Sequence, residues 1–167
     1  IYPKETHFKN LKQLTFGGEN AEAYWSFDDS NLIFQATNAA WGQSCDQIYF
    51  IDTNNYNLAD EKPQMVSLGL GRTTCSYFMP GDTTIIYAST HLENASCPHA
   101  PERRINGKYV WPIYDSYDIF ISDLNGNIVR RLTNHDGYDA EATVSPIGDK
   151  IVFTSIRSGD LELYTCN

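Results

Sequence analysis

Short runs of apolar residues recur along the chain, separated by polar and turn-forming residues. The runs are built from β-branched and aromatic side chains and fall at matching offsets, as in Leu32-Ile33-Phe34, Ile85-Ile86-Tyr87 and Ile151-Val152-Phe153. Between them stand turn residues such as Pro80-Gly81-Asp82 and Asn125-Gly126. Runs of this length and composition, bounded in this way, predict strands rather than helices. We therefore expect an all-β chain.

The runs belong to a unit that occurs three times. Nine-residue segments beginning at Gly18, Gly71 and Gly137 align without gaps, and a later run of each unit matches at 47–52, 118–123 and 162–167. A fourth matching piece precedes each unit: Gln13-Leu14-Thr15, Val66-Ser67-Leu68 and Arg131-Leu132-Thr133. Four short strands per repeat predict four-stranded antiparallel propeller blades, with units at about 12–53, 64–126 and 129–167.

The second unit is longer than a typical blade. The units begin 53 and then 66 residues apart, against roughly 40–45 for common blade repeats. Much of the excess is an insertion at 91–116 between the second and third strands of this unit. It is rich in proline and aromatic residues, Trp111 among them, which disordered linkers rarely contain. We therefore expect an ordered lid, which serves either as a platform for a ligand or partner or as a plug over the channel.

The third unit carries the most specific pattern. Residues 145–155, Ser-Pro-Ile-Gly-Asp-Lys-Ile-Val-Phe-Thr-Ser, are followed at 159–164 by Gly-Asp-Leu-Glu-Leu-Tyr. This resembles the repeat of TolB-type propellers, and the first two units resemble it more loosely. The resemblance covers essentially the whole chain and implies the propeller fold. It says less about function, because such propellers serve as periplasmic partners, as secreted binding modules and as substrate-gating domains of hydrolases.

Three blades are fewer than the four to eight of a closed ring. The piece at 12–15 corresponds to the outer strand of a preceding blade, and 161–165 has no following strand in this sequence. The chain is thus expected to be either a fragment of a longer propeller or half of a six-bladed ring made by two copies. We favour the fragment, with pairing of some kind in any stable preparation because bare strand edges promote association.

Unusual residues are expected to gather on one face of the disc. Glu22, Cys75 and Glu141 share one repeat position near the start of the innermost strand, where they face or rim the channel. Cys45 begins the third strand of the first unit, and the insertion with Cys97 is expected on the same face. Loops on a rigid scaffold are where propellers bind. The candidate binding residues are Glu22, Arg72, His91, Trp111, Tyr138, Asp139 and Glu141.

The cysteines on this face favour a disulfide over a metal site. Cys45 with Cys75 is the preferred bridge, because neighbouring blades present these strand starts side by side, and Cys97 is the alternative partner of Cys75. Together with His91 and His99 the three cysteines include zinc-ligand types. Their spacing follows no zinc-finger pattern, however, and no metal or other cofactor is predicted. Cys166 lies near the opposite face.

Catalysis is not expected. Glu22 and Glu141, with Asp139 close by, are carboxylates of the kind that serve as general acids or bases. Repeat-equivalent carboxylates around a channel more often bind cations, water or neighbouring backbone. The sequence also contains no Gly-x-Ser-x-Gly elbow and no phosphate-binding loop.

Charge limits the partners. A net charge of −9 argues against nucleic acid and anionic membrane surfaces, and no apolar stretch reaches the length of a membrane span. We therefore expect a non-enzymatic propeller scaffold, periplasmic or secreted, that binds a protein or carbohydrate on the insertion face. The alternative is a substrate-gating propeller of a larger hydrolase whose catalytic domain lies outside these residues.

Overall fold

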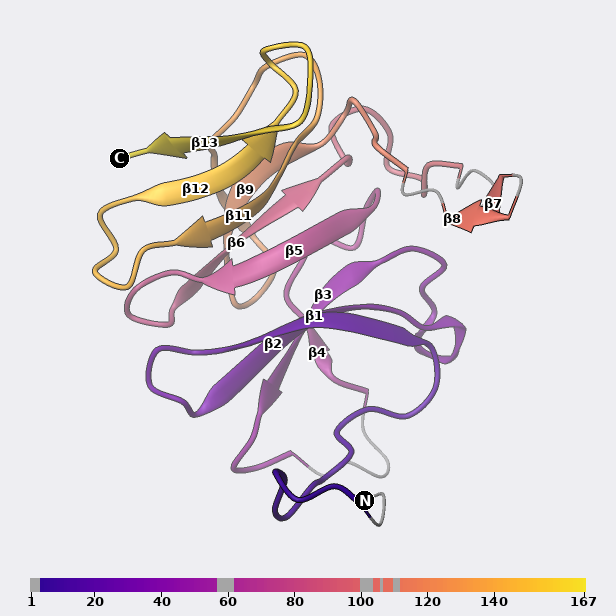
Figure 1. The fold of residues 1–167 in the computed structure, drawn as a ribbon, viewed down its shortest axis with the longest axis vertical. Coiled ribbons are helices and arrows are strands. Elements are labelled where there is room, and N and C mark those ends of the chain that lie inside the picture. Colours follow the sequence, from indigo (N-terminus) through magenta and orange to yellow (C-terminus); the bar gives the residue numbers. More distant parts are fainter. Residues whose placement is uncertain (1–3, 57–61, 100–103, 106, 110–111) are drawn as a thin grey trace.

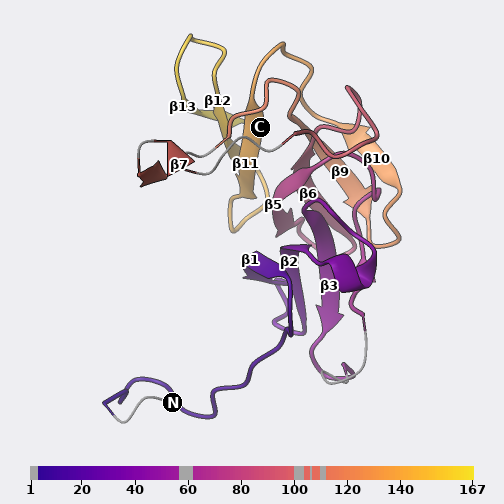
Figure 2. The same ribbon diagram turned by 90° about the vertical axis from the view of Figure 1, so that its right-hand side faces the viewer.

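In a computed structural model of the chain, three antiparallel sheets follow one another as blades around a common inner side (Figures 1 and 2). The structure describes residues 4–56, 62–99, 104–105, 107–109 and 112–167. Two sheets have four strands and the third has three. The all-β architecture predicted from the repeats is confirmed, although the third blade lacks an outer strand within the described residues.

The first blade has strand order β1-β2-β3-β4. Its strands are β1 (Glu19–Trp25), β2 (Asn31–Thr37), β3 (Gln47–Asp52) and β4 (Gln64–Met65). A 3₁₀ turn, η1 (Ala39–Trp41), begins the connection from β2 to β3; Asn38 caps it by accepting a hydrogen bond from the Ala40 amide. This loop leads directly to Cys45, which precedes β3.

The second and third blades repeat this plan. The second contains β5 (Thr73–Phe78), β6 (Thr84–Ser89), β9 (Asp118–Asp123) and β10 (Ile128–Arg131), and the third contains β11 (Asp139–Val144), β12 (Ile151–Ser155) and β13 (Glu162–Cys166). The predicted insertion leaves β6 and returns to β9. Within it, β7 (Arg104–Ile105) and β8 (Lys108–Tyr109) form a small hairpin that projects away from the blades (Figure 1).

The turn between the first two strands has the same shape in every blade. Asp29, Asp82 and Gly148 occupy it at one repeat position and all have positive φ. In the third blade this position requires glycine, because a Cβ there would lie 2.5 Å from Cγ of Pro80 in the second blade. Asp82 also joins two blades, since its carboxylate accepts hydrogen bonds from the amides of Phe27 and Asp28. The turns therefore form part of the contact between blades.

The hydrophobic core lies between the sheets. One cluster joins the first two blades and contains Ile33, Ile48, Val66, Phe78, Ile85 and Tyr87. A second joins the second and third blades and contains Ile86, Ile119, Ala142, Val144 and Phe153. Each blade is thus stabilised by burying its faces against its neighbours, as expected for a repeat whose units cannot bury their apolar faces alone.

The outer strands β4 and β10 join the sheet of the preceding unit. Past β4, the Ser67 hydroxyl accepts a hydrogen bond from the Ile48 amide, and past β10 the Thr133 hydroxyl accepts one from the Ile119 amide. Ser67 therefore corresponds to Thr133. The sequence alignment, which paired Ser67 with Leu132, was displaced by one residue there, because hydrogen-bonding hydroxyl groups define this position better than apolar character.

The expected strand at 12–15 is absent. Residues 4–18 contain no strand; the N-terminal part of this segment extends away from the first blade (Figure 2), whereas Leu14 packs against the core of that blade. A strand is held by hydrogen bonds to a neighbouring strand. Within the described residues, β1 pairs only with β2, and residues 12–15 pair with no strand.

Candidate functional site

The inner strands of all three blades are interrupted by a bulge at the same repeat position. Glu22 in β1, Cys75 in β5 and Glu141 in β11 have φ of 52°, 49° and 59°, and the strand pairing shifts register at each of them. A left-handed non-glycine residue within a strand re-aims its side chain relative to the regular alternation. The repeat position identified in the sequence therefore forms the same bulge in all three blades.

The three bulges line one depression of about 220 Å³ on the inner side of the blades. Tyr24 and Ser76 contribute to its wall. The Tyr24 hydroxyl donates a hydrogen bond of 2.9 Å to Glu22, and the Tyr138 hydroxyl donates one of 3.3 Å to Glu141. Both carboxylates belong to exposed residues, and neither forms an ion pair with a described residue. The depression thus presents two oriented carboxylates to solvent.

The charges of these groups influence one another. Burial raises the pKa of the Cys75 thiol to about 12, and the nearby Glu22 and Glu141 carboxylates add to this increase. Burial and the hydrogen bond to Glu22 raise the pKa of Tyr24 to about 12. At neutral pH the thiol and the phenol are therefore neutral.

The disulfide differs from the preferred prediction. Cys45 is bonded to Cys97, with 5.6 Å between their Cα atoms, while Cys75 and Cys166 are free thiols. The predicted Cys45–Cys75 bridge is therefore wrong in this structure, and so is the alternative Cys97–Cys75 pair. The bulge places Cys75 in the inner depression, whereas Cys97 lies in the insertion beside the end of the β2–β3 loop. The bridge ties this insertion to the first blade.

Arg72 lies close to the bridge. Its guanidinium forms an ion pair with Asp46 and approaches the sulfur of Cys97 to 3.8 Å. The Asp46 carboxylate also accepts a hydrogen bond from the Thr37 hydroxyl. Both charged side chains of the pair are mostly buried. Arg72, predicted to bind a ligand, therefore joins the first blade to the second.

Asp139 also has a structural role. Its side chain is fully buried, and both of its carboxylate oxygens accept hydrogen bonds from Arg157, at 3.1 and 3.0 Å. Tyr138 beside it is 3% exposed and packs edge-on against Tyr117. These two predicted binding residues are thus buried within the fold, although the Tyr138 hydroxyl still contacts Glu141.

His91 and Arg157 occupy equivalent positions after the second strands of their blades. The imidazole Nδ1 of His91 lies 2.9 Å from the hydroxyl of Ser89, and Nε of Arg157 donates to Ser155 at the same distance. His91 packs on Phe120 with 4.6 Å between ring centroids. Burial lowers its pKa. This histidine is thus anchored by packing, which favours its neutral form.

The described ends of the insertion are anchored to the blades. The Gly71 amide donates to the carbonyl of Ala95 at 2.8 Å. At the far end, Tyr117 is buried and its ring contacts that of Tyr114, whose hydroxyl reaches back to the carbonyl of His99. Trp111, predicted to be an ordered binding residue, lies outside the described residues.

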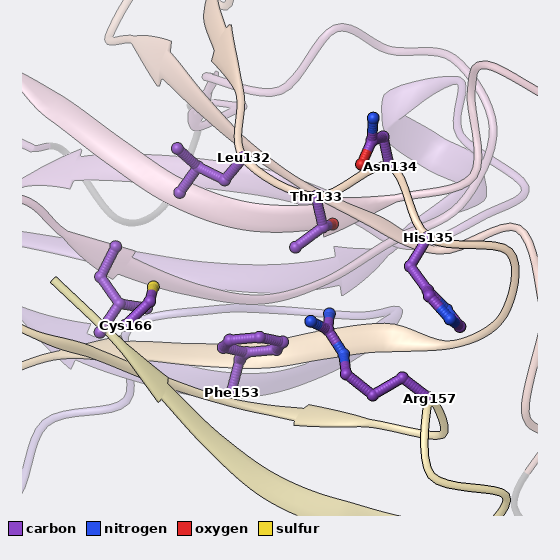
Figure 3. A pocket seen from close by; sticks show the side chains of 8 residues that line it. Leu132, Thr133, Asn134, His135, Phe153, Arg157 and Cys166 are labelled. Carbon is purple, nitrogen blue, oxygen red and sulfur yellow. The ribbon is translucent and has the colours of Figure 1, made fainter.

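A second depression, of about 190 Å³, lies between the second and third blades (Figure 3). Leu132 and Thr133 line it on one side, and Phe153, Arg157 and Cys166 on the other. The Arg157 guanidinium lies 5.0 Å from the centroids of both Phe153 and Tyr164. Because Arg157 is paired with Asp139, this cation belongs to the framework of the third blade.

Other kinds of site are not seen in the parts of the chain that the structure covers. No group of three or more histidine, cysteine, aspartate and glutamate side chains is placed to hold a metal ion there. Across the same residues, no helix is both long and apolar enough to traverse a bilayer.

Sequence reasoning missed several residues of these sites. Arg157 could have been found from its repeat equivalence with His91, and Asp46 from its place before a strand opposite Arg72. Ser76 and Tyr24 gave no such signal. The structure brings Glu22, Cys75 and Glu141 to one depression, while Arg72, His91 and Asp139 contact their own local partners.

Comparison with known proteins identifies a fold. No family model and no curated protein matches the sequence. The crystal structure of TolB from Acinetobacter baumannii matches 89% of the chain with a TM-score of 0.56 and 20% identity, and the chain covers 29% of that structure. A protein provisionally assigned as TolB from Agrobacterium tumefaciens matches 90% of the chain at a TM-score of 0.49 and 16% identity, with 58% of its length covered. The chain therefore has the fold of part of the TolB β-propeller, with three consecutive blades.

Proposed function

We propose that this chain is part of a non-enzymatic propeller scaffold outside the cytoplasm, and that it binds a partner protein on the face that bears the insertion. The observation that carries the proposal is the fastening of this insertion by the Cys45–Cys97 bridge. Holding a long loop in one place costs conformational entropy, and a covalent link to a neighbouring blade reduces that cost. Such anchored loops on rigid scaffolds are typical binding elements.

The location and the partner class have separate support. A disulfide persists in oxidising compartments and is rare in the cytosol, which supports the periplasm or the exterior. The TolB-like fold supports protein binding, since its blades form a rigid frame whose loops are free to contact other molecules. The exposed Leu92 lies on the insertion, three residues after the buried end of β6.

Site-specific crosslinking tests this proposal. A photoreactive amino acid in place of Leu92, 54% exposed on the insertion, is expected to give a discrete adduct in the periplasmic or secreted fraction of the source organism. The matched control is Val129, 61% exposed on the outer strand β10. Mass spectrometry of the adduct identifies the partner. Adducts of equal yield from both positions, or from Val129 alone, would contradict binding at the insertion face.

We further propose that two copies of the 167-residue chain pair to complete a six-bladed ring. The third blade of one copy would pack against the first blade of the other. The two end faces are the surfaces of the first and third blades that face away from the second blade. Repeat-equivalent positions support this pairing. Leu163 in the third blade is 75% exposed, whereas its equivalents Ile48 and Ile119 are at most 1% exposed. Trp25 in the first blade is 52% exposed, whereas Phe78 and Val144 are at most 7% exposed. The two end faces therefore present the same apolar positions that pack between consecutive blades inside the chain, so the third blade of one copy matches the first blade of another.

Light scattering tests the pairing. The wild-type chain at micromolar concentration is expected to have twice the monomer mass, because two blade-to-blade junctions should bury more than the roughly 1,000 Å² of a specific interface. Replacing Leu163 by lysine places a charge in each junction and should give monomers. Replacing Ile147, 82% exposed in a turn, by lysine is the control and should leave the mass unchanged. A monodisperse wild-type monomer would refute the paired ring.

A further inference from the structure

We infer that the depression between the inner strands binds the guanidinium of an arginine side chain. This rests on the proposed function, because the arginine would belong to the partner protein. Glu22 and Glu141 come from the first and third blades, and each is oriented by a tyrosine hydroxyl. Neither has a cationic partner among the described residues.

A second, independent feature points to a ligand at this place. Ser76 also lines the depression, and it is 1% exposed. Its Oγ is buried and finds no hydrogen-bond partner among the described residues. A buried hydroxyl without a partner costs free energy, and native structures seldom leave one unsatisfied. A donor-rich group that enters the depression would supply what Ser76 lacks.

The geometry favours an organic cation over a metal ion. Calcium takes six to eight oxygen ligands and zinc takes four ligands. No set of three carboxylate, thiol or imidazole groups is close enough to hold a metal within the described part of the chain. The buried thiol of Cys75 stays neutral at physiological pH, since its pKa is raised to about 12. Two carboxylates on separate blades, with about 220 Å³ between the walls, suit a larger cation.

Among organic cations the guanidinium matches best. It has five N–H donors in a planar fork, so it can contact carboxylates that approach from two sides. It also stacks on aromatic rings. Tyr24 lines the depression and is held edge-on against Tyr77, with ring centroids 5.3 Å apart. An arginine side chain would thus meet two charges, one aromatic wall and the Ser76 hydroxyl.

Peptide binding tests this inference. The probe is acetyl-Gly-Arg-Gly-amide, and the comparison is the same peptide with citrulline, which has nearly the shape of arginine but no charge. Isothermal titration should show the arginine peptide binding at least about tenfold more tightly, because hydrogen bonds to charged groups are worth more than neutral ones. Raising the salt from about 50 to about 300 mM should reduce this preference by screening.

Two double variants separate the site from the net charge. E22Q/E141Q should remove the preference for arginine over citrulline. E93Q/E162Q removes the same two charges from exposed positions elsewhere and should keep the preference within about twofold, because screening weakens distant charges. Tyr24→Phe removes the hydroxyl that holds Glu22 and should weaken arginine binding without changing the citrulline peptide. Circular dichroism verifies that each variant is folded.

The outcomes are distinct from those of the crosslinking experiment. Equal binding of the two peptides to the wild-type chain would overturn the arginine site, and so would an equal loss in both double variants. After either result, an adduct at Leu92 would still support partner binding, but that binding would not depend on an arginine. Conversely, arginine selectivity without any adduct at Leu92 would refute partner binding at the insertion face but would still support the depression as a binding site.

Discussion

Replacing Arg157 by alanine is expected to destabilise the chain by about 3–5 kcal/mol, the usual cost of removing one partner from a buried ion pair. The Asp139 carboxylate that Arg157 contacts has no exposed surface, so the variant would leave a buried charge without its counter-ion. The same change removes the guanidinium from its place 5.0 Å from the rings of Phe153 and Tyr164. Urea unfolding followed by circular dichroism measures the effect.

Two controls define the cause. Lys150→Ala breaks an ion pair with Asp149 whose side chains are 59% and 46% exposed, and should cost at most about 1 kcal/mol. The double variant Arg157→Ala, Asp139→Ala removes both charges and should be more stable than Arg157→Ala alone. If the single variant were as stable as Lys150→Ala, the pair would not hold the third blade together.

Removing the bridge by Cys45→Ser and Cys97→Ser together is expected to cost up to about 4 kcal/mol. The two cysteines are 52 residues apart, and the entropy lost by the unfolded chain on closing a loop grows with its length. Urea unfolding under non-reducing conditions measures the loss. Peptide mapping without reduction should find the Cys45 peptide linked to the Cys97 peptide.

The exposed thiol provides the matched control for the bridge. Cys166→Ser changes a free, exposed cysteine and should alter stability by no more than about 0.5 kcal/mol. Reducing agent added to the wild-type chain should reproduce the loss seen in the double serine variant. A wild-type chain whose unfolding midpoint is insensitive to reductant would contradict a stabilising Cys45–Cys97 bridge.

The strands and their order followed from local pattern. Whether a segment forms a strand or a turn can be predicted from the residues next to one another in the sequence. The threefold repeat makes the pattern easier to recognise, because it recurs in each unit. The match of residues 32–34, 85–87 and 151–153 thus predicted β2, β6 and β12. The same repeat placed Glu22, Cys75 and Glu141 together, since equivalent positions of neighbouring blades lie side by side.

The direction and partners of individual side chains were decided only by the tertiary structure. The bulge at Cys75 directs this residue to the inner depression and leaves Cys97 to bond Cys45, which no count of residues between cysteines reveals. Asp139 forms an ion pair with Arg157, which follows the end of β12. The sequence by itself determined which residues form strands, because that depends on local alternation. Only the packing of blades determined which residues meet, because those contacts depend on distances between segments far apart in the chain.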